Sequence, residues 1–532
     1  MKYPRWALAI VLPLALCVTG HASPATLETR GLRISIDRAS GDIVSLTAHG
    51  VEMLAQPSRQ WVVRLTDPAS RQSQWLDSGH ARATEVSVGA GLIRVRSILQ
   101  DAGVTVEAVW KQDASGGLTA RCSVSAPPKA ILESVTCPVL KLRATVDGDR
   151  DATRLFMPGG DGFIATHAGM VKNPWAGRSY PGWASMQFMA LYGARGGLTV
   201  QGRDRQALPK AFEAPYDAGS DMVEMRIVHH LPFVLGRAFA TPTALLSACG
   251  PSWQSAADIY KPWARRQWWA RRKTGDAAPP AWLSTGLLTM GGHLRPFGMG
   301  KRPVEADQWP EVVRRLKEAF GASGVLLDLR EWEHDGIYTS PFYFPLYPSD
   351  EEVKRILASV RPLNARATAM VSGLQWMIER KAYTTDTYNV TAFDGRERFE
   401  REGRQVCVIG RDGQPDIAEP YFTWDGAKAR MCPAHAFTQA HFPATARRLA
   451  EAGFAIFEFD QMNGGQCPPC YSSDHGHEPG PGPWMREAIS RFMAATRKAG
   501  RAVSREFATS LEDPCEVYLP HLDTYISRAG HT

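Results

Sequence analysis

Residues 454–461 read FAIFEFDQ, and this stretch decides how the second half of the chain is interpreted. Gly453 comes directly before it, at the end of an amphipathic run, where glycine commonly ends a helix. Residues 454–459 are almost continuously apolar and rich in aromatic rings. This pattern is typical of a parallel strand that is buried on both faces.

Asp460 stands at the expected end of that strand. In (β/α) barrels the chemistry gathers at the C-terminal ends of the strands, because the loops there vary without disturbing the core. Asp460 is therefore a candidate catalytic carboxylate. The alternative is that it caps the following turn or pairs with an arginine.

The composition is that of an ordinary globular protein. The chain has 532 residues, of which 44% are hydrophobic and 22% charged, and this length allows two or three domains. The net charge of +7 comes mostly from scattered arginines. The densest basic cluster, at residues 265–273, is interleaved with tryptophans, which favours a packed linker helix over a nucleic-acid surface. We expect no nucleic-acid partner.

Residues 1–22 resemble a secretory signal peptide. Lys2 and Arg5 precede an apolar stretch at residues 6–18 that is too short to span a bilayer, and small residues around Ala22 offer a cleavage site. No later segment has the roughly 18 uninterrupted apolar residues of a membrane helix. The sequence thus predicts a secreted or periplasmic protein, cleaved near Ala22, without a membrane span in the mature chain.

Residues 23–250 show short alternating runs separated by Gly, Pro, Asp and Ser, for example at 32–37 and 104–109. This spacing predicts an antiparallel β-sandwich. Residues 251–281 follow as a helical connector that ends in a Gly- and Pro-containing linker.

From residue 282 to 532 the pattern changes to alternating strands and helices, which favours a parallel sheet and a (β/α) TIM-type barrel. Gly321, Gly453 and Gly500 are the expected helix stops. Only five or six βα units are found where a full barrel has eight. Either the N-terminal part lends strands, or the barrel is incomplete at the C-terminal end, or the chain is a shortened gene product. The predicted strands are residues 283–290, 324–329, 368–372, 454–460, 502–507 and 522–526.

With the fifth strand at residues 502–507, Glu506 lies near its end and is the predicted partner of Asp460. Glycoside hydrolysis needs such a pair, in which one carboxylate acts as nucleophile or base and one carboxylic acid protonates the leaving oxygen. Glu512 and Glu516 are the alternatives if the register of this strand is different.

Aromatic, acidic and imidazole side chains near the expected strand ends are the predicted substrate contacts, because they can stack on sugars or bind hydroxyl groups. The alternative for the aromatic residues is that they cover the barrel. The residues predicted in this way are Trp332, Glu333, Trp376, Asp474, His475 and His477.

His475 and His477 are one residue apart beside Asp474 and could instead bind zinc. Cys467 and Cys470 have CxxC spacing, but the chain has no second CxxC, so a disulfide is favoured over a metal site. We expect sugar contact from the histidines, and neither a metal nor a cofactor. A zinc-dependent hydrolase that uses this loop is a further alternative.

Several of these motifs resemble an uncharacterised bacterial family of glycoside hydrolases, in which a galactose-mutarotase-like β-sandwich precedes a glycosidase TIM barrel. The resemblance covers roughly residues 27–528 and is specific from about 324 onward. The motifs that carry it are Trp332-Glu333, Tyr343-Phe344-Pro345, Phe457-Glu458-Phe459-Asp460-Gln461, His475-Gly476-His477 with Gly480, Gly482 and Trp484, and Glu506 with Glu516 and Asp523.

The resemblance implies a nucleophilic aspartate after strand four and an acid/base glutamate after strand five, here Asp460 and Glu506, and it adds Glu516 to the substrate contacts. Two departures stand against it. Phe507 follows Glu506 where glycine is expected, and such proteins continue well past the end of this chain. The family has no settled substrate.

The sequence as a whole thus predicts an exported glycoside hydrolase that acts on an oligosaccharide, polysaccharide or glycoside by a retaining two-carboxylate mechanism. The alternative is a non-catalytic, carbohydrate-binding or degenerate relative of such an enzyme.

Overall fold

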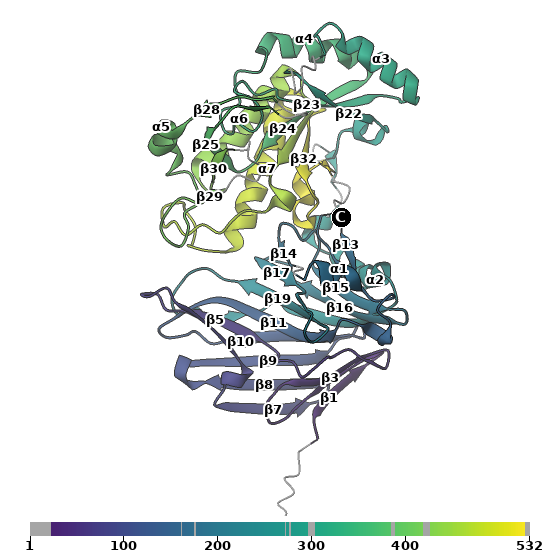
Figure 1. Cartoon of the computed structure of the whole chain (residues 1–532), viewed down its shortest axis with the longest axis vertical. Helices are drawn as coiled ribbons and strands as arrows, with labels where there is room; N and C mark the ends of the chain where they lie inside the picture. The colour runs from purple at the N-terminus through teal and green to yellow at the C-terminus, as the bar shows by residue number, and fades with distance from the viewer. Residues whose placement is uncertain are drawn as a thin grey trace, which may run out of the picture.

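The structure is a computed structural model that describes residues 23–160, 162–174, 177–271, 273–275, 278–295, 304–384, 389–418 and 426–526. The predicted signal peptide, residues 1–22, lies outside these ranges. Antiparallel sheets form one end of the molecule, and a parallel sheet with its helices forms the other (Figure 1). No helix within the described ranges has the length and apolar character needed to cross a membrane.

The N-terminal part consists of three antiparallel sheets. The smallest sheet contains β1 (Ala25–Thr29), β2 (Leu32–Ile36), β3 (Ile43–Ala48) and β4 (Val51–Glu52). The ten-stranded sheet has the order β13 (Phe163–Thr166), β12 (Arg154–Met157), β15 (Phe188–Gly193), β16 (Gly196–Arg203), β21 (Thr243–Cys249), β10 (Leu118–Val124), β9 (Val104–Gln112), β8 (Leu92–Leu99) and β7 (Ala83–Gly89), with β20 (Phe239–Ala240) on β10. The seven-stranded sheet has the order β14 (Gly177–Tyr180), β17 (Lys210–Glu213), β19 (Met222–His230), β11 (Ile131–Arg143), β5 (Val62–Thr66) and β6 (Ser73–Asp77), with β18 (Tyr216–Asp217) on β19.

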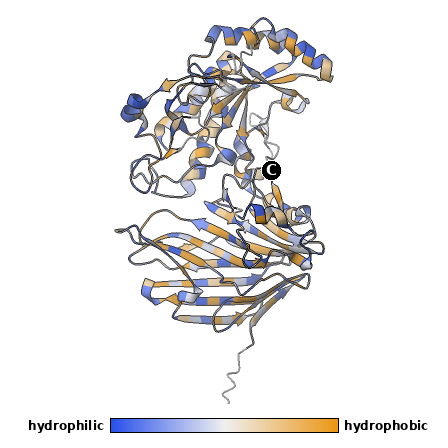
Figure 2. Ribbon diagram, in the orientation of Figure 1, coloured by the Kyte–Doolittle hydropathy of each residue, from blue (hydrophilic) through white to orange (hydrophobic). Residues whose placement is uncertain are grey.

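Several of these strands bury every second side chain, as the alternating sequence predicted, while central strands such as β15 and β16 are buried at nearly every residue. In β9, Val104, Val106, Ala108 and Trp110 are buried while the residues between them are partly exposed. The alternation is visible as orange and blue bands along the strands (Figure 2). The buried side chains of the sheets belong to one continuous core, so the expected antiparallel architecture is confirmed.

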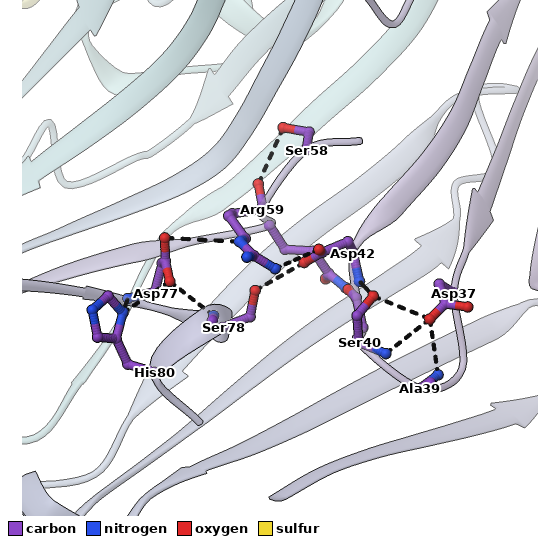
Figure 3. Close-up of polar contacts among 12 residues, drawn as sticks. Asp37, Ala39, Ser40, Asp42, Ser58, Arg59, Asp77, Ser78 and His80 are labelled. Carbon is purple, nitrogen blue, oxygen red and sulfur yellow. Dashed lines mark hydrogen bonds and ion pairs between the residues drawn. The ribbon is translucent and has the colours of Figure 1, made fainter. Parts of the chain in front are cut away.

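Arg59 ties together two turns of the N-terminal part (Figure 3). Its guanidinium group binds Asp42 and lies 3.8 Å from Asp77. Ser78 donates to the same Asp42 carboxylate over 2.9 Å, and Asp77 also contacts the His80 ring. One arginine thus fixes the turn before β3 relative to the turn after β6.

The connector is helical, and several of its tryptophans are buried. It contains α2 (Trp253–Ala264), the short helix η4 (Trp268–Ala270) and η6 (Ala281–Ser284). Trp263 and Trp269 are buried and pack edge to face. This packing agrees with the interpretation of the basic cluster as a linker helix.

After the connector, sheet pairing becomes parallel. Six strands pair in chain order: β22 (Leu288–His293), β23 (Val325–Arg330), β24 (Ala365–Ser372), β31 (Ile456–Asp460), β32 (Ala508–Glu512) and β33 (Thr524–Ile526). The helices around them are α3 (Trp309–Phe320), α4 (Asp350–Val360), α6 (Ala436–Ala452) and α7 (Pro483–Val503). Within the described residues β33 does not pair with β22, so the expected barrel is present as an open six-stranded sheet.

The two faces of this sheet differ in character. Side chains alternate between faces along a strand, and Phe457 and Phe459 of β31 both contact Phe442 of α6. The other face of the same strand carries Glu458 and Asp460. The helices therefore cover an apolar face, and the acidic residues lie on the opposite, inner face.

A long insertion separates β24 from α6. Its four-stranded antiparallel sheet contains β28 (Phe393–Asp394), β25 (Gln375–Arg380), β30 (Ala427–Arg430) and β29 (Ile417–Ala418). A small hairpin of β26 (Tyr383–Thr384) and β27 (Asn389–Val390), with the short helices α5 (Arg396–Arg398) and η8 (Phe399–Gly403), completes it. The N-terminal part also contains the short helix α1 (His167–Lys172).

The predicted fifth strand at residues 502–507 is wrong. Helix α7 continues through Gly500 to Val503, and the strand begins at Ala508. Gly500 does not stop the helix, because its role is to make room for a neighbouring ring. A Cβ atom at Gly500 would lie 2.1 Å from the ring of Phe507, which is fully buried.

Candidate active site

Asp460 and Glu512 occupy the C-terminal ends of two neighbouring parallel strands. Strands β31 and β32 pair in the register Glu458↔Ser510 and Phe459↔Leu511, so Asp460 and Glu512 are next in line on the inner face. Both are only 7% exposed. The amide of Gln461 donates to the Glu512 carboxylate over 2.8 Å, which ties the end of one strand to the end of the other.

A second set of ionisable side chains, Glu458, Asp328 and Arg330, lies beneath this pair. Burial raises the pKa of Glu458 well above its ordinary value, and the nearby negative charges of Asp460 and Asp328 add to the effect. Arg330 opposes it and is itself paired with Asp328 at 2.6 Å. The surroundings of Glu458 thus disfavour a second negative charge next to Asp460.

The inner face also carries buried oxygens that have no hydrogen-bond partner among the described residues. Buried oxygens of this kind can be met by water or by a polar ligand. The oxygens concerned belong to Asp328 (Oδ1), Thr368, Ser510 and Glu458 (Oε2).

The loop after β23 supplies further polar groups to this end of the sheet. Glu331 is fully buried and contacts the His293 ring at the end of β22 over 3.2 Å. Glu333 is also buried, and its burial raises its pKa to about 7. Its carboxyl accepts a hydrogen bond from the Tyr338 amide over 3.2 Å, so this side chain stabilises the loop to which it belongs.

The two tryptophans predicted to bind substrate are core residues, and that prediction is wrong for both. Trp332 is 1% exposed, packs against Tyr343 and donates from its indole nitrogen to the carbonyl of Met370. Trp376 is likewise 1% exposed and packs between Phe342 and Phe437. Neither ring face is available to a sugar.

Glu506 does not lie at the catalytic end of the sheet, and its assignment as acid is wrong. It precedes β32, at the N-terminal edge, with its side chain 49% exposed and paired with Arg361 at 3.1 Å and Arg366 at 3.5 Å. Strand β32 alone separates the two edges by about 13 Å at about 3.3 Å per residue. The carboxylate that does end the fifth strand is Glu512.

Glu516 lies at the junction of the two parts of the chain and not with Asp460 and Glu512. Tyr180 and Tyr260 both donate to its Oε1 atom, over 2.9 and 2.7 Å. Burial raises its pKa to about 7. Its expected role in substrate binding is replaced by a structural one.

The loop residues predicted as substrate contacts do not form one site. They are Asp474, His475 and His477. Asp474 is exposed and bonds to its neighbour Ser473. His475 and His477 face two cysteines, Cys470 and Cys432, each at 3.4 Å. The expected disulfide between Cys467 and Cys470 is absent, and all eight cysteines from Cys122 to Cys515 are free thiols.

A cavity of about 870 Å³ lies between the N-terminal sheets and the loop that follows β31. Some of its charged groups are paired with each other, since Glu133 binds Arg64 at 3.0 Å and Arg411 at 2.6 Å. Neither Asp460 nor Glu512 lines it. The cavity is therefore separate from the carboxylate pair.

Glu458 and Cys432 are not among the residues that the sequence predicts to be functional. The alternation in FEFD contained a signal for the first, because Glu458 and Asp460 must share a face when Phe457 and Phe459 share the other. For Cys432 no local signal exists, since its partners come from a loop about 40 residues later in the chain.

Comparison with solved structures supports this architecture. The α-N-acetylgalactosaminidase NagBb of Bifidobacterium bifidum, in complex with GalNAc, superposes with a TM-score of 0.64 at 12% identity, covering 94% of this chain and 78% of that protein. Its ligand-free structure has the same TM-score and identity, with 79% of that protein covered. At this identity the similarity establishes the fold.

In sequence, a Bacteroides thetaiotaomicron protein named "Putative glycoside hydrolase" is 20% identical over 343 residues, which cover 64% of this chain and 46% of the relative. The match thus spans less than half of that relative's length. A family model described as a domain of unknown function, DUF6259, matches residues 241–531, which is more than half of the chain. The chain belongs to the DUF6259 family.

Proposed function

We propose that this protein is a glycoside hydrolase in which Asp460 is the nucleophile and Glu512 the general acid/base. The observation that carries the proposal is the place of the two carboxylates, buried at the C-terminal ends of adjacent strands and linked through the Gln461 amide. Active sites of (β/α) barrels lie at this end of the strands. The name of the Bacteroides relative and the glycosidase fold of NagBb support the same activity.

The assignment of the acid follows from the observed strand. The family resemblance implied a glutamate after strand five, and the strand that ends at Glu512 moves that position from Glu506 to Glu512. The Asp460 carboxylate attacks the anomeric carbon while the Glu512 carboxyl group gives its proton to the glycosidic oxygen, which leaves with the departing alcohol. Glu512 then takes a proton from water, and this water displaces Asp460 from the sugar.

Retention of configuration is part of the proposal. Retaining enzymes hold their carboxyl groups about 5–5.5 Å apart, and inverting enzymes about 6.5–9.5 Å. Neighbouring strands are about 4.8 Å apart, and Asp460 and Glu512 are in line on two of them. This spacing favours direct attack by a carboxylate over attack by an interposed water.

The layer beneath the pair would keep Asp460 reactive. The raised pKa of Glu458 favours its uncharged form, which limits repulsion of the Asp460 carboxylate, and Arg330 supplies a positive charge to the same region. These two residues act on Asp460 through the local field, and we assign them no contact with the substrate.

We propose a glycoside with an N-acetylgalactosamine-type sugar as the first substrate to test, because NagBb is named for that activity. We also propose export, on the basis of the signal-like residues 1–22. Amino-terminal sequencing of protein recovered from the periplasm or medium tests the second point, and a mature chain that still begins at Met1 would contradict it.

Turnover of aryl α- and β-glycosides by the purified chain tests the activity, with Asp460→Asn as the key variant. We expect hydrolysis by the wild type, loss of at least about 100-fold in kcat for the variant, and unchanged sugar binding. Proton NMR of the first product formed reports whether the anomeric configuration is retained. Measurable binding without turnover by the wild type would contradict the proposal.

That last outcome corresponds to the second candidate function, a carbohydrate-binding protein without catalysis. The observation that favours it is the open edge of the sheet at β33, which leaves the inner face of the described strands without a closed barrel around it.

A further inference from the structure

Four side chains from two separate segments of the chain converge on one point. Cys432 lies between β30 and α6, while Cys470, His475 and His477 belong to the loop between β31 and α7. One ligand atom from each lies within 4.8 Å of all the others. The two cysteines are fully buried and His475 is 8% exposed.

The distances between these ligand atoms fit a tetrahedral metal centre. The sulfur of Cys432 is 3.4 Å from Nε2 of His477, and the sulfur of Cys470 is 3.4 Å from Nδ1 of His475. Zinc binds thiolate at about 2.3 Å and imidazole nitrogen at about 2.0–2.1 Å, which places the sulfur and nitrogen of a tetrahedral site about 3.5 Å apart.

Both imidazoles are held in the tautomer that such a centre requires. Nε2 of His475 donates to the carbonyl of Gln405 over 2.9 Å, which leaves its Nδ1 for the centre. Nδ1 of His477 donates to the carbonyl of Glu478 over 2.8 Å, which leaves its Nε2 for the centre. Metal-binding histidines generally use their outer nitrogen in this way.

Further contacts fix the groups that face the centre. The Ile409 amide points at the Cys470 sulfur over 3.3 Å, as backbone amides do toward thiolates. The His477 ring stacks on Trp484 with 3.7 Å between ring centroids. The Cys432 amide donates to the carbonyl of Val406, so the insertion also anchors the site.

We infer that Cys432, Cys470, His475 and His477 bind one structural Zn²⁺ ion. Two thiolates and two imidazoles are the ligands that zinc prefers, and four protein ligands leave no open position for a substrate. The ion would fasten the loop that follows β31 to the insertion before α6. This excludes the loop as the centre of a zinc-dependent hydrolase, and it is independent of the proposed glycosidase activity.

A disulfide between Cys432 and Cys470 is the competing account. It would explain two buried sulfurs but not two imidazoles whose outer nitrogens are fixed and whose inner nitrogens face the sulfurs. It also predicts a mass lower by two hydrogens and two fewer titratable thiols, so the two accounts can be separated.

The test is the metal content of the purified full chain after loading with zinc and dialysis, measured by plasma mass spectrometry. We expect about one zinc per chain, lost in Cys432→Ser and in His477→Ala. Cys467→Ser is the matched control, since Cys467 lies in the same loop but outside the cluster, and it should retain the metal.

Cobalt replacement of zinc in the wild type provides a readout that does not depend on variants that fold poorly. We expect the visible absorption of tetrahedral Co²⁺ with thiolate charge-transfer bands. Wild-type protein without bound zinc, a Cys432–Cys470 disulfide, or equal zinc content in Cys432→Ser and Cys467→Ser would each overturn the inference.

Discussion

Glu516 offers a quantitative test of how the two parts of the chain are joined. It comes from the loop after β32, and the two hydroxyl groups that bind it come from β14, through Tyr180, and from α2, through Tyr260. Replacing Glu516 with alanine leaves both buried hydroxyls without this acceptor. Replacing it with glutamine keeps an acceptor oxygen of the same reach.

The magnitudes follow from these contacts. A buried polar group that loses its partner costs about 1–3 kcal/mol, so Glu516→Ala should lower the free energy of unfolding by about 2–4 kcal/mol. Glu516→Gln should cost less at neutral pH. The difference between the two variants isolates the two tyrosine hydrogen bonds.

The pH dependence has a definite sign. Burial raises the pKa of Glu516 from about 4.5 to about 7, so between these values the unfolded chain has lost the proton and the folded chain still holds it. Stability from this group is then present below about pH 4.5 and declines as the pH rises to about 7. At about 1.4 kcal/mol per pKa unit, the decline is about 3 kcal/mol.

Urea unfolding followed by tryptophan fluorescence, at a series of pH values from 4.5 to 7.5, measures both effects. Wild type should lose about 3 kcal/mol more than Glu516→Gln across this range, because glutamine does not titrate. If the two proteins show parallel pH profiles, Glu516 is not a buried, protonated carboxyl. If alanine and glutamine cost the same, the tyrosine hydrogen bonds do not stabilise the junction.

Three further substitutions test the fold around the sheet. Gly500→Ala should cost about 1–3 kcal/mol in unfolding free energy because its Cβ would clash with Phe507, and a gain of about 1 kcal/mol, as alanine gives in an unhindered helix, would refute this. Trp332→Ala should lower the unfolding free energy by about 3–5 kcal/mol. A variant with normal thermal stability but weaker sugar binding would instead support the prediction that Trp332 contacts the substrate. Glu506→Gln should change the unfolding free energy by less than about 1 kcal/mol, because its ion pairs are half-exposed, and a larger loss would contradict its surface role.

The fourth strand could be predicted from sequence because its signals are local. Gly453 ends α6 in the left-handed conformation, and the aromatic run that follows has the length of a buried strand. The place of Asp460 at the end of that strand follows from these two facts alone. The alternating strands of the N-terminal part were predictable for the same reason, since apolar and polar residues alternate along them in the sequence.

The predicted position of the fifth strand was wrong because a glycine can either end a helix or allow close packing within one. Gly500 was interpreted as a helix stop, but it serves close packing against Phe507, and only the folded structure shows which use applies. The error moved the strand by about six residues and exchanged Glu512 for Glu506. A register error of this kind changes the predicted acid without changing the predicted fold.

The predictions of substrate contact were wrong for a different reason. Aromatic residues after a strand can cover the core or line a site, and composition does not distinguish these roles. Trp332 and Trp376 cover the core. The Cys and His cluster combines a loop with a cysteine far away in sequence, and such long-range pairing is visible only after folding.

The most direct test of the proposed carboxylate pair is the leaving-group dependence of kcat/KM in Glu512→Gln, with Glu506→Gln as the control. An acid catalyst matters most for poor leaving groups, so the Glu512 variant should lose about 100-fold or more on alkyl glycosides and much less on activated aryl glycosides. The Glu506 variant should match the wild type on both. The opposite pattern, with Glu506→Gln impaired and Glu512→Gln unaffected, would contradict the account.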